Sequence, residues 1–436
     1  MSSRIYDLLV VGSGPTGSIA AAKAAARGLS VLILERGLPA SKAPWFSFDR
    51  TSSNLLHHGI LTPTPPAHSA LALPSVLGGG FAANSGFYHW PLGSFLDELS
   101  PFLSGAELSS ARAWVESCLP LVTAPRTAAA EALATASASV GATPIDVPTW
   151  ITPEFLPTGP FLPAASSAGA DLRPAAKVLR LSQNGRLRTA VLADGSTVSA
   201  RAVLLAAGPF GSFELASRSG LVPATTTAAA HLMMRSVLFP ASNGPSTYQP
   251  IGNVQIRHAP EVLSGCALSE PWSLAGAHPE AIEEIRSAVA SSIRPYGWYT
   301  QVSQAPAFSL RATRRRLSIR EAFDTASPAF QQAASVHLGL LAASKLPWFF
   351  SGANPHPTSP SQMLAAPRLS VVHLMSTLPL GTVLASDGSF PNDPLIGCCD
   401  SSVLPASPGV NPQAVSMAVA AVLSDRFIDK LSLGSA

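Results

Sequence analysis

The sequence predicts an α/β fold in which a parallel sheet carries an inserted β-meander and a second domain interrupts the chain. Three observations lead to this prediction. A glycine-rich turn joins two short apolar segments near the N-terminus, within residues 6–37. Residues 171–208 alternate apolar and polar side chains between turn signals. Residues 226–369 lack both patterns and hold aromatic groups that suggest a separate, substrate-facing domain: Trp272, Trp298-Tyr299 and Trp348-Phe349-Phe350.

The composition describes a globular chain with few charges. Of 436 residues, 47% are hydrophobic and 12% are charged, against about 25% charged in an average soluble domain. This length is sufficient for two domains and a large core. The net charge of +3 is small, which argues against nucleic acid as the main partner. The mean hydropathy of +0.28 leaves open an apolar substrate or a loose association with membranes.

No apolar run approaches the ~18 to 20 residues that a spanning helix needs. The first apolar run leads directly into the glycine-rich turn, without the pattern of a secretory signal. We therefore expect no integral membrane segment and a cytoplasmic location.

The first element is a β-α-β unit, YDLLVVGSGPTGSIAAAKAAARGLSVLILERG. The run Leu8–Val11 is too short for a helix and predicts a buried parallel strand. A helix rich in small residues is expected over Ser18–Ala26, where it can pack closely on the sheet. Leu29–Leu34 predicts the second strand, and Glu35 follows it directly.

The turn of this unit predicts a dinucleotide site. Gly12, Gly14 and Gly17 form the pattern G-x-G-x-x-G. The three glycines allow a tight turn, close approach of backbone to a pyrophosphate, and contact between helix and sheet. The helix N-terminus favours an anion, and an acid in the position of Glu35 binds ribose hydroxyls. This motif alone leaves both NAD and FAD open.

The alternating region favours FAD. Turns are expected at Asn184-Gly185 and Asp194-Gly195, and the region ends in an apolar run, Ala202–Ala206. This predicts a three-stranded meander that leads back to a parallel strand. Such an insertion is typical of flavoproteins and not of simple NAD dehydrogenases.

Five blocks in the same order resemble the glucose-methanol-choline (GMC) flavin oxidoreductases. They are GSGPTG…LERG at the start, LGGGFAANSGFYHW at 77–90, AAGPFGSFELASRSG at 206–220, HLMSTLPLG at 373–381 and DSSVLPASPGVNPQAVSMAVA at 400–420. The resemblance implies an FAD cofactor and oxidation of a small-molecule alcohol by hydride transfer to flavin N5, with oxygen or a carrier as electron acceptor.

The resemblance also implies a fold with two domains. A Rossmann-like FAD-binding domain, with a parallel sheet and a β-meander, is expected from residues 1–115, 166–225 and 370–436. A second, α+β substrate domain built on an antiparallel sheet is expected from residues 116–165 and 226–369.

The family's cofactor positions can be carried over to this chain residue by residue. Gly12, Gly14, Gly17 and Glu35 match the ADP-binding positions, and Val178 matches the contact of the meander with adenine. The loop beside the flavin ring, and the segment against the ribityl chain and pyrimidine edge, are matched by Gly79, Gly80, Asn84, Asp400 and Pro412.

His373 and Asn411 match the two catalytic positions of the family, and Asn at the second position resembles the cholesterol oxidase branch. An imidazole suits proton removal from an alcohol because its ordinary pKa is about 6.5. We expect His373 to project beyond the end of the strand LSVVH and act as the base. Asn411 is expected to orient the substrate oxygen and also to cap the helix that starts at Pro412.

Some residues depart from the family pattern. Ser376 stands where Gly is usual, the last helix lacks a common Glu, the strand before Asp400 reads PLIGCC, and the chain is short for the family. Two alternatives therefore stay open: a flavin-retaining lyase without net redox chemistry, and a degenerate member that serves in binding or assembly.

Other reactive residues are expected to be structural. The four cysteines, of which Cys398 and Cys399 are adjacent in a predicted buried strand, have no metal-ligand spacing. His57-His58, His89, His337 and His356 show no such spacing either, and only His89 is close to a predicted site loop. The arginines between Arg311 and Arg320 are read as a solvated face, with an acceptor or lipid-headgroup patch as the alternative.

Overall fold

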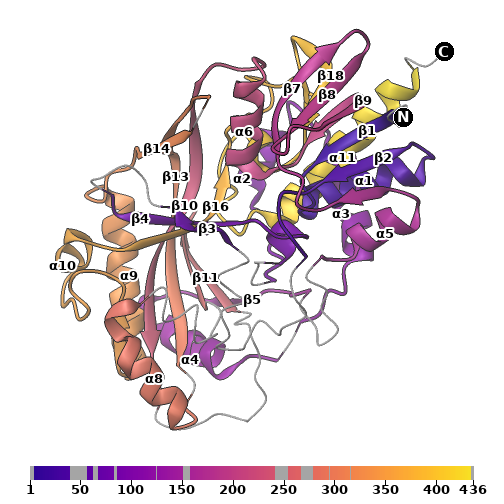
Figure 1. Cartoon of the computed structure of the whole chain (residues 1–436). Coiled ribbons are helices and arrows are strands. Elements are labelled where there is room, and N and C mark those ends of the chain that lie inside the picture. The colour runs from indigo at the N-terminus through magenta and orange to yellow at the C-terminus, as the bar shows by residue number, and fades with distance from the viewer. Residues whose placement is uncertain are drawn as a thin grey trace.

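The computed structural model describes residues 4–39, 56–61, 67–82, 86–123, 125–150, 158–240, 254–266, 278–293, 295–314 and 316–433. Within these ranges the chain forms two sheets, of eight and ten strands. The first sheet, with α1 and α11, occupies the upper right of Figure 1, and the second sheet, with α9, α8 and α4, the lower left.

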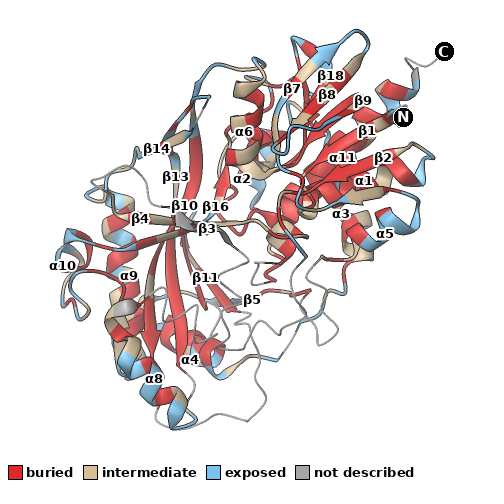
Figure 2. Ribbon diagram, in the orientation of Figure 1, coloured by how far each residue is buried: buried red, intermediate tan, exposed pale blue. Residues whose placement is uncertain are grey.

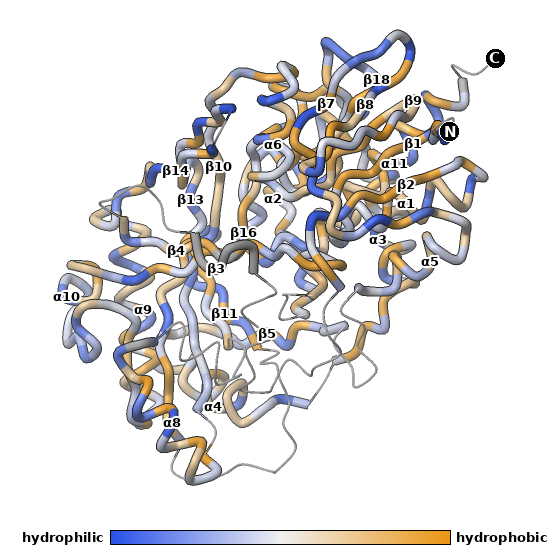
Figure 3. The backbone as a smooth tube through the Cα atoms, viewed as in Figure 1, coloured by the Kyte–Doolittle hydropathy of each residue, from blue (hydrophilic) through white to orange (hydrophobic). Residues whose placement is uncertain are grey.

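The first sheet brings together strands from both ends of the chain. Its order is β17-β18-β9-β1-β2-β6, and every pair is parallel except β17 with β18. The strands are β1 (Tyr6–Val11), β2 (Val31–Leu34), β6 (Asp171–Arg173), β9 (Thr197–Leu205), β17 (Ser389–Phe390) and β18 (Asp393–Cys398). β1, β2 and the second half of β9 are buried, as red in Figure 2 shows, and β1 and β9 are mainly hydrophobic in Figure 3. The predicted parallel sheet is confirmed.

The predicted meander is also present. β7 (Val178–Asn184), β8 (Leu187–Leu192) and β9 pair in sequence, all antiparallel. The predicted turn glycines, Gly185 and Gly195, have φ of 60° and 83°, a left-handed conformation that suits glycine. A buried ion pair between Arg188 and Asp393, 2.6 Å apart, ties the meander to β18.

Helices from the two ends of the chain pack on one another beside this sheet. They are α1 (Pro15–Ala26) and α11 (Gln413–Leu433), with α3 (Gly105–Cys118) and α5 (Phe161–Ser167) next to them. The first half of α11 is mostly apolar and buried, so hydrophobic packing stabilises its position. Asp425 of α11 pairs with Lys23 and Arg27 of α1 at 2.9 and 2.8 Å. No helix in the described part of the chain combines the length and the apolarity needed to span a membrane.

The second sheet has the order β3-β4-β16-β10-β13-β12-β11-β5, with β14 beside β13 and β15 beside β10. Its pairs are antiparallel except β4 with β16. The strands are β3 (Leu56–Leu61), β4 (Ser69–Pro74), β5 (Pro144–Asp146), β10 (Thr225–Leu238), β11 (Val254–Ala259), β12 (Val262–Cys266), β13 (Tyr296–Ala312), β14 (Leu317–Glu321), β15 (Trp348–Phe350) and β16 (Leu369–Met375).

One face of the second sheet is covered by α9 (Pro328–Ser344) and α4 (Ala128–Ser137). His337 of α9 hydrogen-bonds to Ser236 of β10 and Thr300 of β13, each at 2.9 Å. Because side chains alternate along a strand, the neighbours of Ser236 and Thr300 project from the opposite face. The remaining α-helices are α2 (Gly93–Leu99), α6 (Gly208–Arg218), α8 (Ile282–Ala290) and α10 (Pro360–Ala365).

For three strands, the sheet in which they pair is not the one expected from the predicted domain ranges. β3, β4 and β16 lie in the second sheet, although ranges 1–115 and 370–436 assign almost all of their residues to the FAD-binding domain. The reason is that β16 pairs with β10, which the local sequence of β16 does not reveal. The division into two domains stays a prediction, with these strands moved to the substrate domain.

Candidate active site

The glycine turn after β1 is closely packed. Gly12 has φ of +109°, and a Cβ there would lie 2.2 Å from the carbonyl oxygen of Ala206. A Cβ on Gly17 would lie 2.1 Å from the carbonyl oxygen of Gly12. Both positions therefore exclude a side chain. Gly14 differs, because a Cβ there would have only ordinary contacts, the nearest being 3.8 Å from the nitrogen of Gly80.

The second glycine loop lies against the first. η2 (Gly79–Phe81) is a short 3₁₀ helix, and a Cβ on Gly79 would lie 2.9 Å from the Cα of Gly14. The backbone nitrogen of Gly78 donates to Ser13 Oγ at 3.1 Å, which joins the two loops. The structure thus brings Gly14, Gly79 and Gly80 together as backbone without side chains. Asn84, predicted for the same loop, lies outside the described residues.

Glu35 lies at the end of β2 and is almost fully buried. Its Oε2 accepts from the backbone nitrogen and Oγ of Ser13 at 3.0 and 2.7 Å, and its Oε1 accepts from the nitrogen of Gly37 at 2.7 Å. The carboxylate therefore orders the glycine turn and retains acceptor capacity for a ribose hydroxyl. Val178, half-buried at the start of β7, comes two residues after Ala176, whose nitrogen donates to the Glu35 carbonyl.

Asp400 is buried two residues after the end of β18, in contact with the first residue of α6, Gly208. Its carboxylate accepts from Ser212 Oγ and from the backbone nitrogens of Gly208 and Ser402 at 2.5, 2.9 and 2.9 Å, and also from Ser402 Oγ. Burial raises the pKa of Asp400, and these donors oppose the rise. The described contacts give Asp400 a role in holding this junction. Its predicted contact with the cofactor stays a prediction.

His373 and Asn411, the predicted catalytic pair, lie together. Asn411 Nδ2 is 3.3 Å from His373 Nε2. Gln255 of β11 donates from Nε2 to Asn411 Oδ1 at 2.7 Å and to Tyr299 OH of β13 at 2.7 Å. The Asn411 oxygen therefore accepts from Gln255, and its predicted role as the cap of α11 stays a prediction.

A second histidine, His231 of β10, lies on the other side of His373. The two Nδ1 atoms are 3.0 Å apart, and His231 Nε2 is 2.7 Å from Ser407 Oγ. Hydrogen bonding in this chain of groups assigns each proton. Because the Asn411 amide donates, His373 Nε2 must carry a lone pair, so its proton is on Nδ1. His373 Nδ1 then donates to His231 Nδ1, and His231 Nε2–H donates to Ser407.

Both histidines are held neutral. Burial, with the nearby charge of Arg235, lowers the pKa of His373 to about 3. Burial lowers the pKa of His231 well below its ordinary value, and a proton on His373 would lower it further. At neutral pH His373 therefore presents an unprotonated Nε2 beside Asn411, which is the form that a general base requires.

Several buried polar atoms in the first turns of α11 and directly after β16 have no partner in the described part of the chain. They are Gln413 Nε2 and Oε1, Ser416 Oγ and Ser376 Oγ. Such atoms cost about 1 to 3 kcal/mol each unless a ligand or water satisfies them. Pro412, the predicted cofactor contact, is buried immediately before α11. These groups, with the bare glycine loops, suit a large ligand rich in donors and acceptors, as FAD is.

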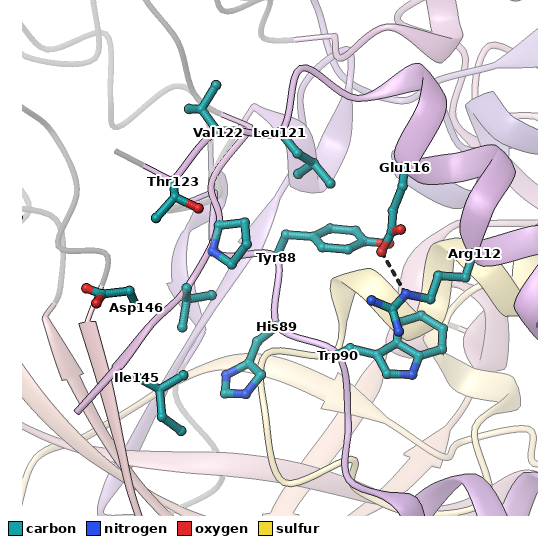
Figure 4. A pocket seen from close by; sticks show the side chains of 12 residues that line it. Tyr88, His89, Trp90, Arg112, Glu116, Leu121, Val122, Thr123, Ile145 and Asp146 are labelled. Carbon is teal, nitrogen blue, oxygen red and sulfur yellow. Dashed lines mark hydrogen bonds and ion pairs between the residues drawn. The ribbon is translucent and has the colours of Figure 1, made fainter. Parts of the chain in front are cut away.

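His89, the histidine singled out beside the predicted loop, reaches the same network. Its Nδ1 contacts Gln255 Oε1 at 2.5 Å. His89 also lines a cavity of about 430 Å³ (Figure 4) with Tyr88, Trp90 and the ion pair Arg112–Glu116. In this view Arg112 lies beside the Trp90 ring, and its guanidinium carbon is 4.5 Å from the ring centroid. Gln255 thus connects this cavity to Asn411.

Sequence reasoning missed His231, Gln255 and Ser407, and it noted Tyr299 only as one of the aromatic residues of the substrate-facing region. The nearest available signal was period-two alternation in HLMMR, which places His231, Met233 and Arg235 on one face of a strand.

The described residues contain no metal-binding group of three or more His, Cys, Asp or Glu side chains. Cys398 and Cys399 are buried at the end of β18 and its next residue, as predicted. The described arginines 311, 314, 316 and 320 are exposed on the β13–β14 hairpin.

Comparison with known families assigns the chain. The family model described as FAD dependent oxidoreductase matches residues 7–302, and the one described as GMC oxidoreductase matches residues 302–420. The chain belongs to the GMC-type FAD dependent oxidoreductases. Its cofactor is FAD, and the predicted fold class is confirmed.

Solved structures show the same fold. Pyridoxine 4-oxidase from Mesorbium loti is similar with a TM-score of 0.73 and 16% identity, over 96% of this chain and 98% of that one. Formate oxidase from Aspergillus oryzae is similar with a TM-score of 0.71 and 14% identity, over 99% of both chains. A segment of 31 residues is 71% identical to digeranylgeranylglycerophospholipid reductase 1 of Methanococcoides burtonii, which covers 7% of this chain and only 8% of that protein.

Proposed function

We propose that this GMC-type oxidoreductase oxidises an alcohol to a carbonyl, with His373 as the base and Asn411 orienting the substrate oxygen. The observation that carries the proposal is the contact between Asn411 Nδ2 and His373 Nε2, 3.3 Å apart. One group offers a hydrogen-bond donor and the other a lone pair. A hydroxyl placed against both atoms can accept from Asn411 and donate to His373.

The surroundings of the pair support these roles. Gln255 fixes the Asn411 amide so that its NH₂ group points toward His373. His231 accepts from His373 Nδ1, which keeps Nε2 free in the neutral ring and stabilises the ring when Nε2 takes a proton. A positioned general base of this kind contributes ~10² to 10⁴-fold to a rate.

Bound FAD supplies the hydride acceptor, flavin N5. The residues proposed to hold FAD are Gly12, Gly14, Gly17, Glu35, Gly79, Gly80, Asn84, Val178, Asp400 and Pro412. The N-terminus of α11 carries a partial positive charge that favours an anionic ligand by ~0.3 to 1 kcal/mol or more when partly buried. The final electron acceptor, oxygen or a carrier, and the cytoplasmic location stay predictions.

Anaerobic mixing of the purified holoprotein with a panel of alcohols tests the proposal. An alcohol substrate should bleach the flavin absorbance and yield one equivalent of carbonyl product. A flavin-retaining lyase would convert its substrate with the absorbance unchanged. A binding or assembly subunit would show neither change. Admission of air then distinguishes oxygen from a carrier as acceptor, by the rate at which the absorbance returns.

A further inference from the structure

The face of the second sheet that holds His231 carries a row of polar side chains. On β10 this face presents His231, Met233 and Arg235, and the residues opposite them on β13 are Ser303, Gln301 and Tyr299. Side chains of directly opposed residues lie on the same face, about 4.5 to 5.5 Å apart at Cβ. Tyr299 accepts from Gln255, which holds Asn411. This row of polar side chains therefore runs from the proposed catalytic pair, His373 and Asn411, to Arg235.

Arg235 is a cation without an anionic partner in the part of the chain described. Its Nε is buried without a hydrogen-bond partner, and its Nη2 contacts only the sulfur of Met233 at 3.9 Å. None of the described ion pairs includes it. Burial lowers its pKa to about 10, so the guanidinium is still charged at neutral pH. A buried charge is strongly unfavourable unless it is paired.

Gln301 lies between Arg235 and the histidines. It is fully buried, and neither its Nε2 nor its Oε1 has a described partner. The neighbouring Ser303 Oγ is also buried without a partner. Arg235, Gln301 and Ser303 therefore have hydrogen-bond donors or acceptors without a described partner. The proposed base, His373, lies on the same face of the sheet. This arrangement favours a polar ligand over the apolar substrate that the mean hydropathy left open.

We propose that the substrate is an anionic alcohol, most simply a small hydroxy acid, whose carboxylate binds Arg235 and Gln301 while its hydroxyl lies at His373 and Asn411. This inference rests on the proposed function for the position of the hydroxyl. The guanidinium offers two parallel N–H donors that match a carboxylate, and the Gln301 amide adds a donor. His231, which pairs with His373, is four residues from Arg235, or about 13 Å along an extended strand. The Arg235 side chain contacts Met233, which lies between them, so its guanidinium is closer to the histidines than its backbone is.

Ligand binding and turnover together test this proposal in the FAD-loaded protein. Butyrate and benzoate serve as carboxylate probes without a hydroxyl, and butyramide and benzamide are their neutral controls. The carboxylates should raise the melting temperature and perturb the flavin spectrum, and the amides should do so only at ~10- to 100-fold higher concentration, as a charge-assisted hydrogen bond implies. 4-Hydroxybutyrate and 4-(hydroxymethyl)benzoate should exceed their amides in kcat/KM by a similar factor.

Variants assign the effect to Arg235. Arg235→Met should abolish the preference for the carboxylate, and Arg235→Lys should keep part of it, because a lysine retains the charge but not the planar pair of donors. Gln301→Leu should weaken carboxylate binding by a smaller factor. Arg320→Met, on the exposed hairpin, is the matched control and should change nothing.

The outcomes separate this inference from the proposed function. Carboxylate binding that depends on Arg235, without flavin bleaching by any alcohol, would support the anion site and contradict alcohol oxidation. Bleaching by neutral alcohols with equal response to acids and amides would overturn the anion site and leave alcohol oxidation intact. The strand register places Arg257 of β11 on the same face as Gln301, through Leu263 of β12. A carboxylate preference that survives Arg235→Met but is lost in Arg257→Met would also overturn the assignment.

Discussion

His231 and His373 face each other across β10 and β16, with Nδ1 atoms 3.0 Å apart and ring planes at 88°. Their register pairs the two residues directly. The relationship makes His231 the acceptor that fixes the proton of His373 on Nδ1.

The first prediction concerns this pair. His231→Leu removes the acceptor, so the His373 proton is free to move to Nε2, where it blocks the base. We expect the rate of alcohol-driven flavin reduction to fall by ~10²-fold, with the amount of bound FAD unchanged. His231→Asn, whose Oδ1 can also accept, should recover much of the rate. Equal losses in both variants would show that His231 acts through packing alone.

The second prediction concerns stability against pH. Burial lowers the pKa of His337 to about 3, whereas an unfolded histidine titrates at about 6.5. Below pH 6.5 the unfolded chain binds a proton that the folded chain does not, so stability is full above that pH and falls as pH decreases toward 3. His337 alone should cost about 2 kcal/mol between pH 7.5 and pH 5.

Urea denaturation at several pH values measures this dependence. Burial lowers the pKa of His258 and His373 as well, to about 4 and about 3, so the wild-type loss should exceed that of one histidine. His337→Gln should reduce the slope of unfolding free energy against pH, and His356→Gln, at an exposed position, should not. A wild-type stability that is level from pH 7.5 to pH 5 would contradict the burial of neutral histidines.

The third prediction concerns Ser376, which has φ of +63° and a buried Oγ without a described partner. A left-handed conformation costs a residue with a side chain ~1 to 2 kcal/mol. A glycine avoids this cost, but part of the gain in stability is lost because glycine makes the unfolded chain more flexible. Ser376→Gly should stabilise the protein by about 0.5 to 1 kcal/mol in thermal unfolding. Ser376→Ala retains the strain and should gain less. A loss in both variants would indicate that the hydroxyl binds the cofactor.

The fourth prediction concerns Asn411. Asn411→Asp keeps an acceptor for Gln255, so the melting temperature should stay near that of the wild type. The carboxylate has no N–H for the substrate oxygen, and its charge raises the pKa of His373. We expect flavin reduction to fall by ~10²-fold or more and to become faster as pH rises, because the neutral base returns at higher pH. A wild-type rate with a level pH profile would leave Asn411 without a catalytic role.

The sequence allowed the first sheet to be predicted because local patterns determine its parts. The tight turn of Gly12 and Gly17, the meander turns and the short apolar strands each depend on neighbouring residues. The family blocks at His373 and Asn411 likewise placed both residues at positions that the fold brings together.

The remaining parts of the site depend on register between distant strands. His231 meets His373 across 142 residues, and Gln255 meets Asn411 across 156. No local pattern in the antiparallel strands specifies these partners, and a shift of one residue would turn each side chain to the other face. For the same reason the pairing of β16 with β10 could not be predicted, and the unpaired state of Arg235 became visible only with its neighbours present.

The central claim is that His373 removes the substrate proton, and anaerobic stopped-flow reduction of the flavin in His373→Ala tests it most directly. With a substrate found in the alcohol panel, the variant should bind FAD as the wild type does and be reduced ~10²-fold or more slowly. Added imidazole should restore part of that rate. Reduction of His373→Ala within about threefold of wild type, far less than a positioned base contributes, would contradict the account.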